Sequence, residues 1–415
     1  MRKSNLVSDF ISLCKDNLNV AFIYKNKKIA YQKLYEDIFK MIEVFKNNNL
    51  NPGDKVLLFI FPSYNFYLTM LASIYYGLNI VVIDSFKDKK RVKDLIDISN
   101  IKYCFIDGKT NLLKAILPRL YFINIFNYKK NNGVVIDYIN YGNTVLTTFT
   151  SGTTGVPKAI NRSINDLEKQ VNLLLDNICF DDSSTILCGL PIYMLLILIL
   201  GKTAIIDNKI NYKYSYDTVL MPIEKVLKNK NVNKNVKYMF LGGAILYRKE
   251  VERIKYLYPN ANVNYVYGSS EGVLIAAVNL NDFNNLTFKN KILGIDVELV
   301  DGEIMISGDS ILTESKSHLT GDLGFFNDNG LKILGRKKYS NADFYNYVYD
   351  EMILNENPFV KKGFSFWYNN CVNFVYEGKL SVKRDNVRYY KFRKLPMDNK
   401  HKTKLDYNCV MKVIK

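Results

Sequence analysis

The spacing of apolar residues over the first 110 positions predicts alternating helices and strands. Tyr31–Asn47 repeats large apolar side chains at helical spacing, and Lys55–Phe61 is an apolar run typical of a buried strand. By the same criteria we expect helices over Tyr64–Tyr76 and Arg91–Ser99 and strands over Ile80–Asp84 and Tyr103–Asp107. This order predicts a parallel sheet with helices on both faces, and such sheets bind ligands at the carboxyl ends of their strands.

The pattern changes near Gly335-Arg336. Before this point we expect Glu298–Ser307 to form a hairpin that turns at Asp301-Gly302, and Leu331–Leu334 to form a short strand. The residues after it are too few for a large core. We therefore expect an α/β protein with two domains. Residues 1–337 form a large N-terminal domain of βαβ-type sheets packed with helices, and residues 338–415 form a small α+β C-terminal lid domain.

Tyr64–Ile83 is uncharged over about the length that spans a bilayer. Asn65, Gly77 and Asn79 interrupt it, so a buried helix followed by a strand is the better interpretation, and we expect no transmembrane segment. The N-terminal residues lack the uninterrupted apolar run of a secretory signal. The six cysteines show neither CxxC pairs nor metal-ligand spacing, which suits a reducing, cytoplasmic compartment.

The formal net charge of +17 raises the question of a nucleic-acid partner. Lysine is abundant along the whole chain, however, and the densest basic runs, Lys87–Lys93 and Lys383–Lys394, are interrupted by aspartates. Since the positive charge is not gathered into one stripe, we expect no nucleic-acid binding. Some of the positive charge can instead help to attract a small anionic ligand.

Thr148–Lys158 (TFTSGTTGVPK) is the strongest chemical signal in the sequence. It follows an expected strand, Thr144–Phe149, and combines hydroxyls, glycines and one lysine. Glycines let backbone N–H groups approach phosphate oxygens, while hydroxyls and a lysine add donors, so the segment is typical of a phosphate-binding loop. A polar surface loop is the alternative. The candidate residues are Thr150, Ser151, Gly152, Thr153, Thr154, Gly155 and Lys158.

Three further segments follow expected strands or precede one, and each alone would pass for an ordinary turn. In Tyr267–Gly272 (YGSSEG) the Glu271 carboxylate suits Mg²⁺ bridged to phosphates, and Tyr267 could stack on a purine. Gly243 and Ala244 in Leu241–Ala244 would let the backbone lie close to a flat ring. Asp322, in a Thr-Gly-Asp segment expected just before a strand, could accept both ribose hydroxyls, with Arg336 as an added donor.

Together and in this order, these segments resemble the adenylate-forming superfamily of acyl-CoA synthetases, nonribosomal-peptide adenylation domains and luciferases. The resemblance covers essentially the whole chain. It implies ATP and Mg²⁺ as cofactors, a small-molecule carboxylic acid as substrate, and a lid that rotates about Lys337/Lys338. The residues it assigns to nucleotide binding are those of the Thr148–Lys158 loop, Gly243, Ala244, Tyr267, Gly268, Ser269, Ser270, Asp322 and Arg336, with Glu271 as the metal ligand.

The C-terminal tail Leu395–Lys404 (LPMDNKHKTK) is similar to that of long-chain acyl ligases and of the β-lactone synthetases of bacterial olefin biosynthesis. By this resemblance Lys404 is the lid lysine that meets the α-phosphate and the substrate carboxylate, and Lys404, Glu271 and Thr150 are the catalytic residues. Two departures stand out. Leu190–Met194 lacks the family's histidine before a shortened segment, and Ala159 replaces the glycine that usually closes the phosphate loop.

Three functions remain open from the sequence. The first is an AMP-forming acid–thiol ligase that transfers a fatty or other apolar acid to CoA or to the phosphopantetheine of an acyl carrier protein; the apolar run Met194–Leu200, expected near the acyl pocket, favours an apolar acid. The second is a β-lactone synthetase that closes a 3-hydroxyacyl-adenylate. The third is a catalytically reduced nucleotide-binding paralogue that acts as a partner protein.

Overall fold

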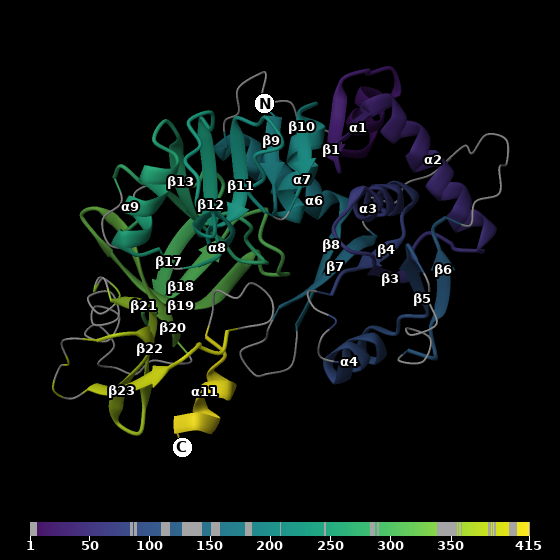
Figure 1. Cartoon of the computed structure of the whole chain (residues 1–415). Helices are drawn as coiled ribbons and strands as arrows, with labels where there is room; N and C mark the ends of the chain where they lie inside the picture. Colours follow the sequence, from purple (N-terminus) through teal and green to yellow (C-terminus); the bar gives the residue numbers. More distant parts are fainter. Residues whose placement is uncertain are drawn as a thin grey trace. The chain divides into compact units, whose positions relative to one another are not determined.

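The computed structural model divides the chain into two compact units, Met1–Leu220 and Met221–Lys415. In Figure 1 the first unit runs from purple to teal and the second from green to yellow. The structure describes residues 6–83, 86, 89–108, 117–126, 143–150, 158–178, 185–207, 209–244, 246–282, 287–288, 290–337, 355, 357, 359–380, 383, 385, 387–397 and 405–414.

The first unit contains a six-stranded sheet in the order β6-β5-β3-β4-β7-β8 (Figure 1). Its first five strands pair in parallel, as the alternating pattern predicts, and only β8 runs antiparallel, against β7. The strands are β3 (Lys55–Phe59), β4 (Asn79–Val81), β5 (Tyr103–Ile106), β6 (Tyr121–Asn124), β7 (Thr144–Thr150) and β8 (Lys158–Ser163).

Helices connect these strands at the expected places, namely α2 (Tyr31–Asn47), α3 (Tyr64–Tyr76) and α4 (Lys89–Ser99). α3 begins where the Ser63 hydroxyl accepts a hydrogen bond from the Phe66 N–H at 3.2 Å, and it ends at Gly77, whose φ of 89° suits glycine. The uncharged stretch is therefore a buried helix followed by β4. No helix among the described residues is long and apolar enough to cross a membrane.

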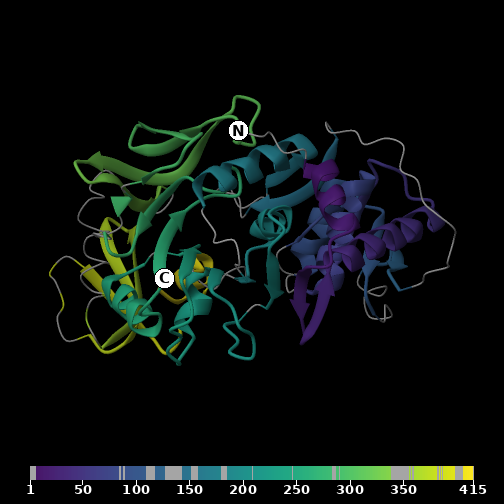
Figure 2. The ribbon, with the colours of Figure 1, turned by 90° about the horizontal axis from the view of Figure 1, so that it is seen from above.

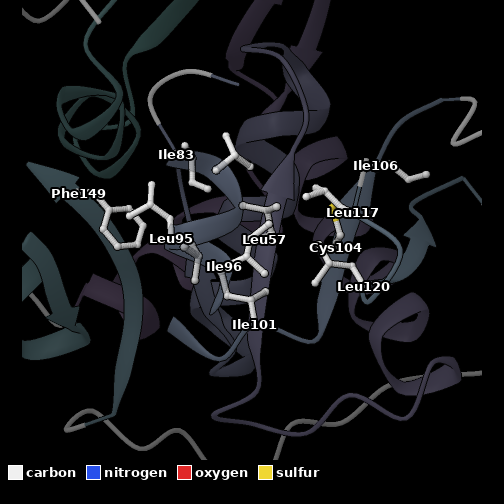
Figure 3. Close-up of a cluster of buried hydrophobic side chains, with 12 residues drawn as sticks. Leu57, Ile83, Leu95, Ile96, Ile101, Cys104, Ile106, Leu117, Leu120 and Phe149 are labelled. Carbon is white, nitrogen blue, oxygen red and sulfur yellow. The ribbon is translucent and has the colours of Figure 1, made fainter. Parts of the chain in front are cut away.

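A cluster of buried side chains fixes the six-stranded sheet against α4 (Figure 3). Leu57 of β3 meets Leu95 and Ile96 of α4 there, and Phe149 of β7 joins the same cluster. Burying a leucine or phenylalanine side chain stabilises the fold by about 1.5–3 kcal/mol. The strand that leads into the Thr148–Lys158 segment is thus anchored in the core through Phe149.

A second set of strands in the first unit has the order β11-β9-β10-β1-β2. Its β1–β10, β10–β9 and β9–β11 pairs are parallel, and β1–β2 is antiparallel. The strands are β1 (Val20–Tyr24), β2 (Lys27–Ala30), β9 (Thr185–Cys188), β10 (Thr203–Ile206) and β11 (Thr218–Pro222), and the helices of this part are α1 (Leu6–Lys15), α6 (Ile164–Asn177) and α7 (Pro191–Ile199).

The apolar run Met194–Leu200 lies in α7 and at its end. Met194, Leu196 and Ile197 are fully buried. Leu195, Leu198 and Ile199 line a cavity of about 30 Å³ together with apolar side chains of α1, α2 and α3. Core packing within the first unit accounts for the apolar character of this run, so the run does not identify an acyl pocket.

Before its C-terminal part, the second unit carries strands of two sheets, drawn mainly in green in Figures 1 and 2. In one, β12 (Tyr238–Gly242) is parallel to β13 (Asn262–Tyr267), and β14 (Ala276–Asn279) and β16 (Asn290–Lys291) continue it antiparallel. The other has the order β15-β20-β19-β18-β17 and is antiparallel throughout. Its strands are β15 (Thr287–Phe288), β17 (Asp296–Val300), β18 (Glu303–Ser307), β19 (Ser317–Asn327) and β20 (Gly330–Arg336), and the helices of this part are α8 (Ile223–Leu227) and α9 (Arg248–Leu257).

The hairpin expected over Glu298–Ser307 is present as β17 and β18. It turns at Asp301 and Gly302, whose φ angles are 50° and 75°. Two consecutive positive φ angles match the right-handed twist of the strands, which explains the Asp-Gly pair. The Thr-Gly-Asp segment, in contrast, does not precede a strand as expected. It lies inside the 11-residue strand β19.

The C-terminal part of the second unit is a small α+β element, as predicted. Its sheet consists of β21 (Val360–Tyr368), β22 (Cys371–Gly378) and β23 (Val387–Phe392), and α11 (Tyr407–Ile414) follows. β21 carries Trp367, the one tryptophan of the chain. The chain divides into its two compact units at Leu220/Met221. The domain boundary expected at Lys337/Lys338 therefore stays a prediction.

Candidate active site

The Thr148–Lys158 segment begins on β7 and ends on β8, and these two strands are paired. β7 ends at Thr150 and β8 begins at Lys158, and these two residues are partners in the antiparallel register. The Lys158 side chain is exposed. The residues that connect the two strands, Ser151, Gly152, Thr153, Thr154 and Gly155 among them, lie outside the described residues, so their assignment to phosphate binding stays a prediction.

In the second unit, Asp322 joins three of the segments that the sequence singled out. The Tyr267 hydroxyl donates to Asp322 Oδ2 at 2.7 Å, and the Arg336 guanidinium Nε lies 2.9 Å from Asp322 Oδ1. Arg336 also donates from Nη1 to the Thr320 carbonyl at 3.0 Å. Each carboxylate oxygen keeps a further lone pair for another donor. The structure thus brings Tyr267, Asp322 and Arg336 together, and their assignment to nucleotide binding stays a prediction.

Burial and the neighbouring negative charge keep Tyr267 in its neutral form. Burial is the larger cause that raises the pKa of the Tyr267 phenol well above its usual value, and the Asp322 carboxylate adds to it. The phenol therefore remains a hydrogen-bond donor throughout the physiological pH range. Its ring also lies near Phe288, with centroids 5.9 Å apart.

The Gly-Gly-Ala turn lies beside the same tyrosine strand. β12 and β13 are parallel neighbours, so Gly243 and Ala244 leave β12 at the edge where Tyr267 ends β13. Gly243 has a φ of 88°, with no atom within 4 Å of the position that a Cβ would take. The Ala244 carbonyl accepts a hydrogen bond from the Tyr265 hydroxyl at 2.9 Å. The turn is therefore held in place and open on its outer side, as a surface for a flat ring requires.

Glu271 sits in a tight turn after β13. The Ser269 hydroxyl accepts a hydrogen bond from the Gly272 N–H at 2.9 Å, and a side chain at Gly268 would collide with the Val273 carbonyl. Glu271 itself is only 7% exposed, and its Oε1 lies 3.6 Å from His318 Nε2. The sequence alone did not single out His318, because this contact depends on the fold.

The donor set at Glu271 fits a magnesium ion that is shared with phosphates. Within the part of the chain that the structure describes, no three His, Cys, Asp or Glu side chains are grouped as a metal cluster would need. A single carboxylate is nevertheless the usual protein contribution where Mg²⁺ takes its other ligands from water and substrate phosphates. Glu271 thus remains the predicted metal ligand.

The lid lysine of the resemblance, Lys404, falls in residues 398–404, which the structure does not describe. On either side of this segment, Met397 and Leu405 form an isolated antiparallel bridge. The Leu395 N–H also donates to the Glu377 carboxylate at 2.6 Å. The role of Lys404 stays a prediction.

The chain is similar to known proteins in sequence over part of its length and in fold over nearly all of it. Residues 15–208 match the family model described as "AMP-binding enzyme". No curated protein sequence matches the chain. Among solved structures, the O-succinylbenzoate coenzyme A synthetase of Bacillus subtilis, in complex with AMP, is similar over 96% of this chain and 97% of its own, with a TM-score of 0.84 and 14% identity.

Two other solved structures are similar over nearly their whole length. A benzoate CoA ligase from Burkholderia xenovorans has a TM-score of 0.82 and 13% identity, covering 98% of this chain and 99% of its own. The amide bond synthetase McbA from Marinactinospora thermotolerans has a TM-score of 0.83 and 13% identity, covering 99% and 100%. At these identities the likeness establishes a shared fold, and it confirms the α/β architecture with a small C-terminal domain.

Proposed function

We propose that this chain, of which residues 15–208 match the model described as "AMP-binding enzyme", is an adenylate-forming enzyme that uses ATP and Mg²⁺ to convert a carboxylic acid into an acyl-adenylate, with release of pyrophosphate. One observation carries the proposal above all. Tyr267 and Arg336, which come from two separate segments, both contact the carboxylate of Asp322, which belongs to a third, beside an open Gly-Ala turn. That combination provides a flat surface for a base and an anionic acceptor for a sugar.

Each residue contributes through binding and positioning. Asp322 accepts the ribose hydroxyls, held in place by Tyr267 and Arg336, and Gly243 and Ala244 lie against the base. In the first unit, Lys158 and the hydroxyls and N–H groups between Thr150 and Gly155 hold the phosphates. Attack of a carboxylate on the α-phosphate needs positioning and charge neutralisation more than covalent catalysis.

Two positive groups complete the assignment. Glu271 would hold the Mg²⁺ ion, which neutralises phosphate charge when bound. Lys404 meets the α-phosphate and the acid's carboxylate, and the part of the chain after Lys337 acts as the lid that brings it there. Both assignments rest on the resemblance of the sequence segments.

The acceptor that we propose is a thiol, either CoA or the phosphopantetheine of an acyl carrier protein. Two of the similar structures bear names that include CoA, and the same two names include benzoate or a substituted benzoate. We therefore propose an apolar acid and place aromatic acids beside fatty acids as the first candidates. Because Met194–Leu200 belongs to the core, it supports no choice between them.

Pyrophosphate release in the presence of Mg²⁺ and ATP tests the proposal. The panel contains benzoate, O-succinylbenzoate, fatty acids of several lengths and 3-hydroxy acids, each with and without CoA. We expect pyrophosphate release with at least one apolar acid, and a larger pyrophosphate yield when CoA consumes the adenylate. A Lys404→Ala variant should release at least tenfold less (about 1.4 kcal/mol of transition-state stabilisation), while Lys402→Ala behaves as wild type.

Other outcomes discriminate the alternatives. CoA-independent turnover confined to 3-hydroxy acids would indicate the β-lactone synthetase. ATP binding without pyrophosphate release from any acid would contradict an enzyme and favour the nucleotide-binding paralogue. Full activity of Lys404→Ala would remove that residue from the mechanism.

A further inference from the structure

Arg162 is a buried cation in the first unit that none of the roles above uses. It belongs to β8, four residues after Lys158, and only 4% of it is exposed. Burying a guanidinium is costly unless it is hydrogen-bonded, and an aliphatic residue of similar size would fill the same space. Its presence at this position therefore calls for a physical reason beyond packing.

Its hydrogen bonds connect the phosphate-loop segment to a helix. Arg162 Nη1 donates to the Thr148 hydroxyl at 2.8 Å, and its Nε donates to the Gln170 side-chain carbonyl at 3.1 Å. Gln170 is fully buried on α6, a helix that begins at the capping box of Ser163 and Asp166. The guanidinium thus ties β7, which carries the start of the Thr148–Lys158 segment, to a fixed helix.

The strand register places this charge close to the loop. Thr148 is the partner of Ile160 and Thr150 is the partner of Lys158, while Arg162 faces Leu146. Because side chains alternate between the two faces of a strand, Thr148, Lys158 and Arg162 share one face. Thr148 lies two residues, about 7 Å, before Thr150. With the Thr148 side chain and its 2.8 Å hydrogen bond added, the guanidinium lies within about 12 Å of the Thr150 backbone.

We propose that Arg162 is a positioning residue for the phosphate-binding loop: it holds Thr148 in place and adds a fixed positive charge beside β7, the strand that leads into the loop, which strengthens the binding of the polyphosphate part of the nucleotide. This inference rests on the proposed function and extends it to a residue outside the loop. Arginine suits the role better than lysine, because its fork contacts both acceptors at once and its charge is permanent.

Equilibrium binding of three probes tests the proposal, namely Mg·ATP, inorganic triphosphate and adenosine. Two unit charges about 12 Å apart at an effective dielectric constant of about 20 interact strongly enough to change an affinity about tenfold. We therefore expect Arg162→Met to weaken ATP and triphosphate binding about tenfold and to leave adenosine binding unchanged. Arg119→Met, which removes an 89% exposed arginine of the same unit, should bind all three probes as wild type does.

A second pair of variants keeps the proposal testable even if Arg162→Met does not fold. Thr148→Val removes the hydroxyl that Arg162 holds and should weaken triphosphate binding. Thr148→Ser keeps the hydroxyl and should bind triphosphate as wild type does. Arg162→Lys should retain more triphosphate affinity than Arg162→Met, because it preserves the charge.

The outcomes separate this inference from the proposed function. If the wild type binds neither ATP nor triphosphate, the proposed function fails, and this inference fails with it. If the wild type binds both and the variants of Arg162 and Thr148 bind them equally well, only this inference is overturned. An equal loss of adenosine and triphosphate affinity would overturn it too, since that result indicates a purely structural role.

Discussion

Asp322 depends on its neighbours to present its carboxylate in one orientation. Tyr267 and Arg336 hold its two oxygens separately, and the Asp322 N–H donates to the Thr320 hydroxyl at 3.2 Å. A carboxylate that is only 9% exposed needs such partners, because burying it unpaired would be costly. The same contacts that stabilise the charge also fix the direction in which a sugar would be bound.

Removal of the Tyr267 hydroxyl should therefore lower stability. Tyr267→Phe keeps the ring but withdraws one donor from Asp322, and a hydrogen bond to a charged group is worth about 1.5–3 kcal/mol. We expect the thermal midpoint to fall by about 3–6 °C, taking roughly 2 °C per kcal/mol for a unit of this size. Differential scanning calorimetry measures it.

Tyr256→Phe provides the matched control, because that tyrosine is 71% exposed on α9 of the same unit. Its midpoint should stay within 1 °C of wild type, as is usual for about ±0.5 kcal/mol surface changes. An unchanged midpoint in Tyr267→Phe would mean that Asp322 gains nothing from the phenol.

At the scale of elements, helices were more predictable than strand ends. α2 and α3 begin and end where their apolar spacing and the Gly77 stop signal place them. β3 and β4, in contrast, end at Phe59 and Val81, short of the expected Phe61 and Asp84. A strand ends where its pairing partner ends, and a single sequence carries little information about that partner.

The Thr-Gly-Asp segment shows why glycine misled the sequence interpretation. Gly321, in the segment expected just before a strand, lies within β19, and so does Gly324. Gly321 takes a φ of 74°, and at Gly324, beside a register shift, a Cβ would come within 2.8 Å of the Lys332 carbonyl. Glycine marks an irregularity and a close backbone approach here, which only the neighbouring strands reveal.

Among the site residues, too, some could be predicted from the sequence and others could not. The residue types in the nucleotide segments were readable, because their chemistry is local to each segment. Arg162 and His318 were not singled out, since their importance depends on Thr148 and Glu271, which only the fold brings close. The one local signal for Arg162 is its place in a strand, β8, whose other residues carry no charge apart from Lys158.

The N-terminus of α9 offers a pH-dependent prediction. The Tyr247 N–H donates to Glu250 Oε2 at 3.0 Å, and burial raises the pKa of the Glu250 carboxyl, although the Tyr247 N–H, Lys249 and Lys362 each lower it. A carboxyl whose pKa is higher in the folded state favours folding while it is protonated. That contribution is complete below the unfolded pKa of about 4.3 and is lost as pH rises through the folded value.

Glu250→Gln keeps an oxygen for the Tyr247 N–H and removes the charge. We expect its thermal midpoint to gain on wild type as pH rises from about 4 to about 8, the range above the unfolded carboxyl pKa. Glu252→Gln, at an exposed position of the same helix, should show no such trend. A midpoint difference that shrinks with rising pH would contradict the prediction.

At the scale of the whole molecule, the proposed binding of ATP is linked to folding. Binding to the folded chain alone must raise its stability by mass action, by about 2.7 kcal/mol when free ligand is 100 times its dissociation constant. We therefore expect Mg·ATP to raise the thermal midpoint in a concentration-dependent way, and chelation of Mg²⁺ by EDTA to remove much of the gain.

Glu271 supplies the variant for this experiment. Glu271→Gln should lose the Mg²⁺-dependent part of the stabilisation while it keeps the part that ATP gives in EDTA. Glu298→Gln, at an exposed position of β17 in the same unit, serves as the control and should match wild type. If the magnesium dependence of Glu271→Gln equals that of wild type, Glu271 is not the metal ligand.

Trp367 gives the C-terminal sheet an optical label that needs no engineering. It is the chain's single tryptophan, it is partly buried, and it lies on β21. Selective excitation of tryptophan therefore reports the surroundings of that three-stranded sheet alone, while the 31 tyrosines stay silent. Stopped-flow emission during a single turnover would follow the C-terminal element in time, and comparison with the rate of pyrophosphate release would tell whether its rearrangement precedes or follows the chemistry.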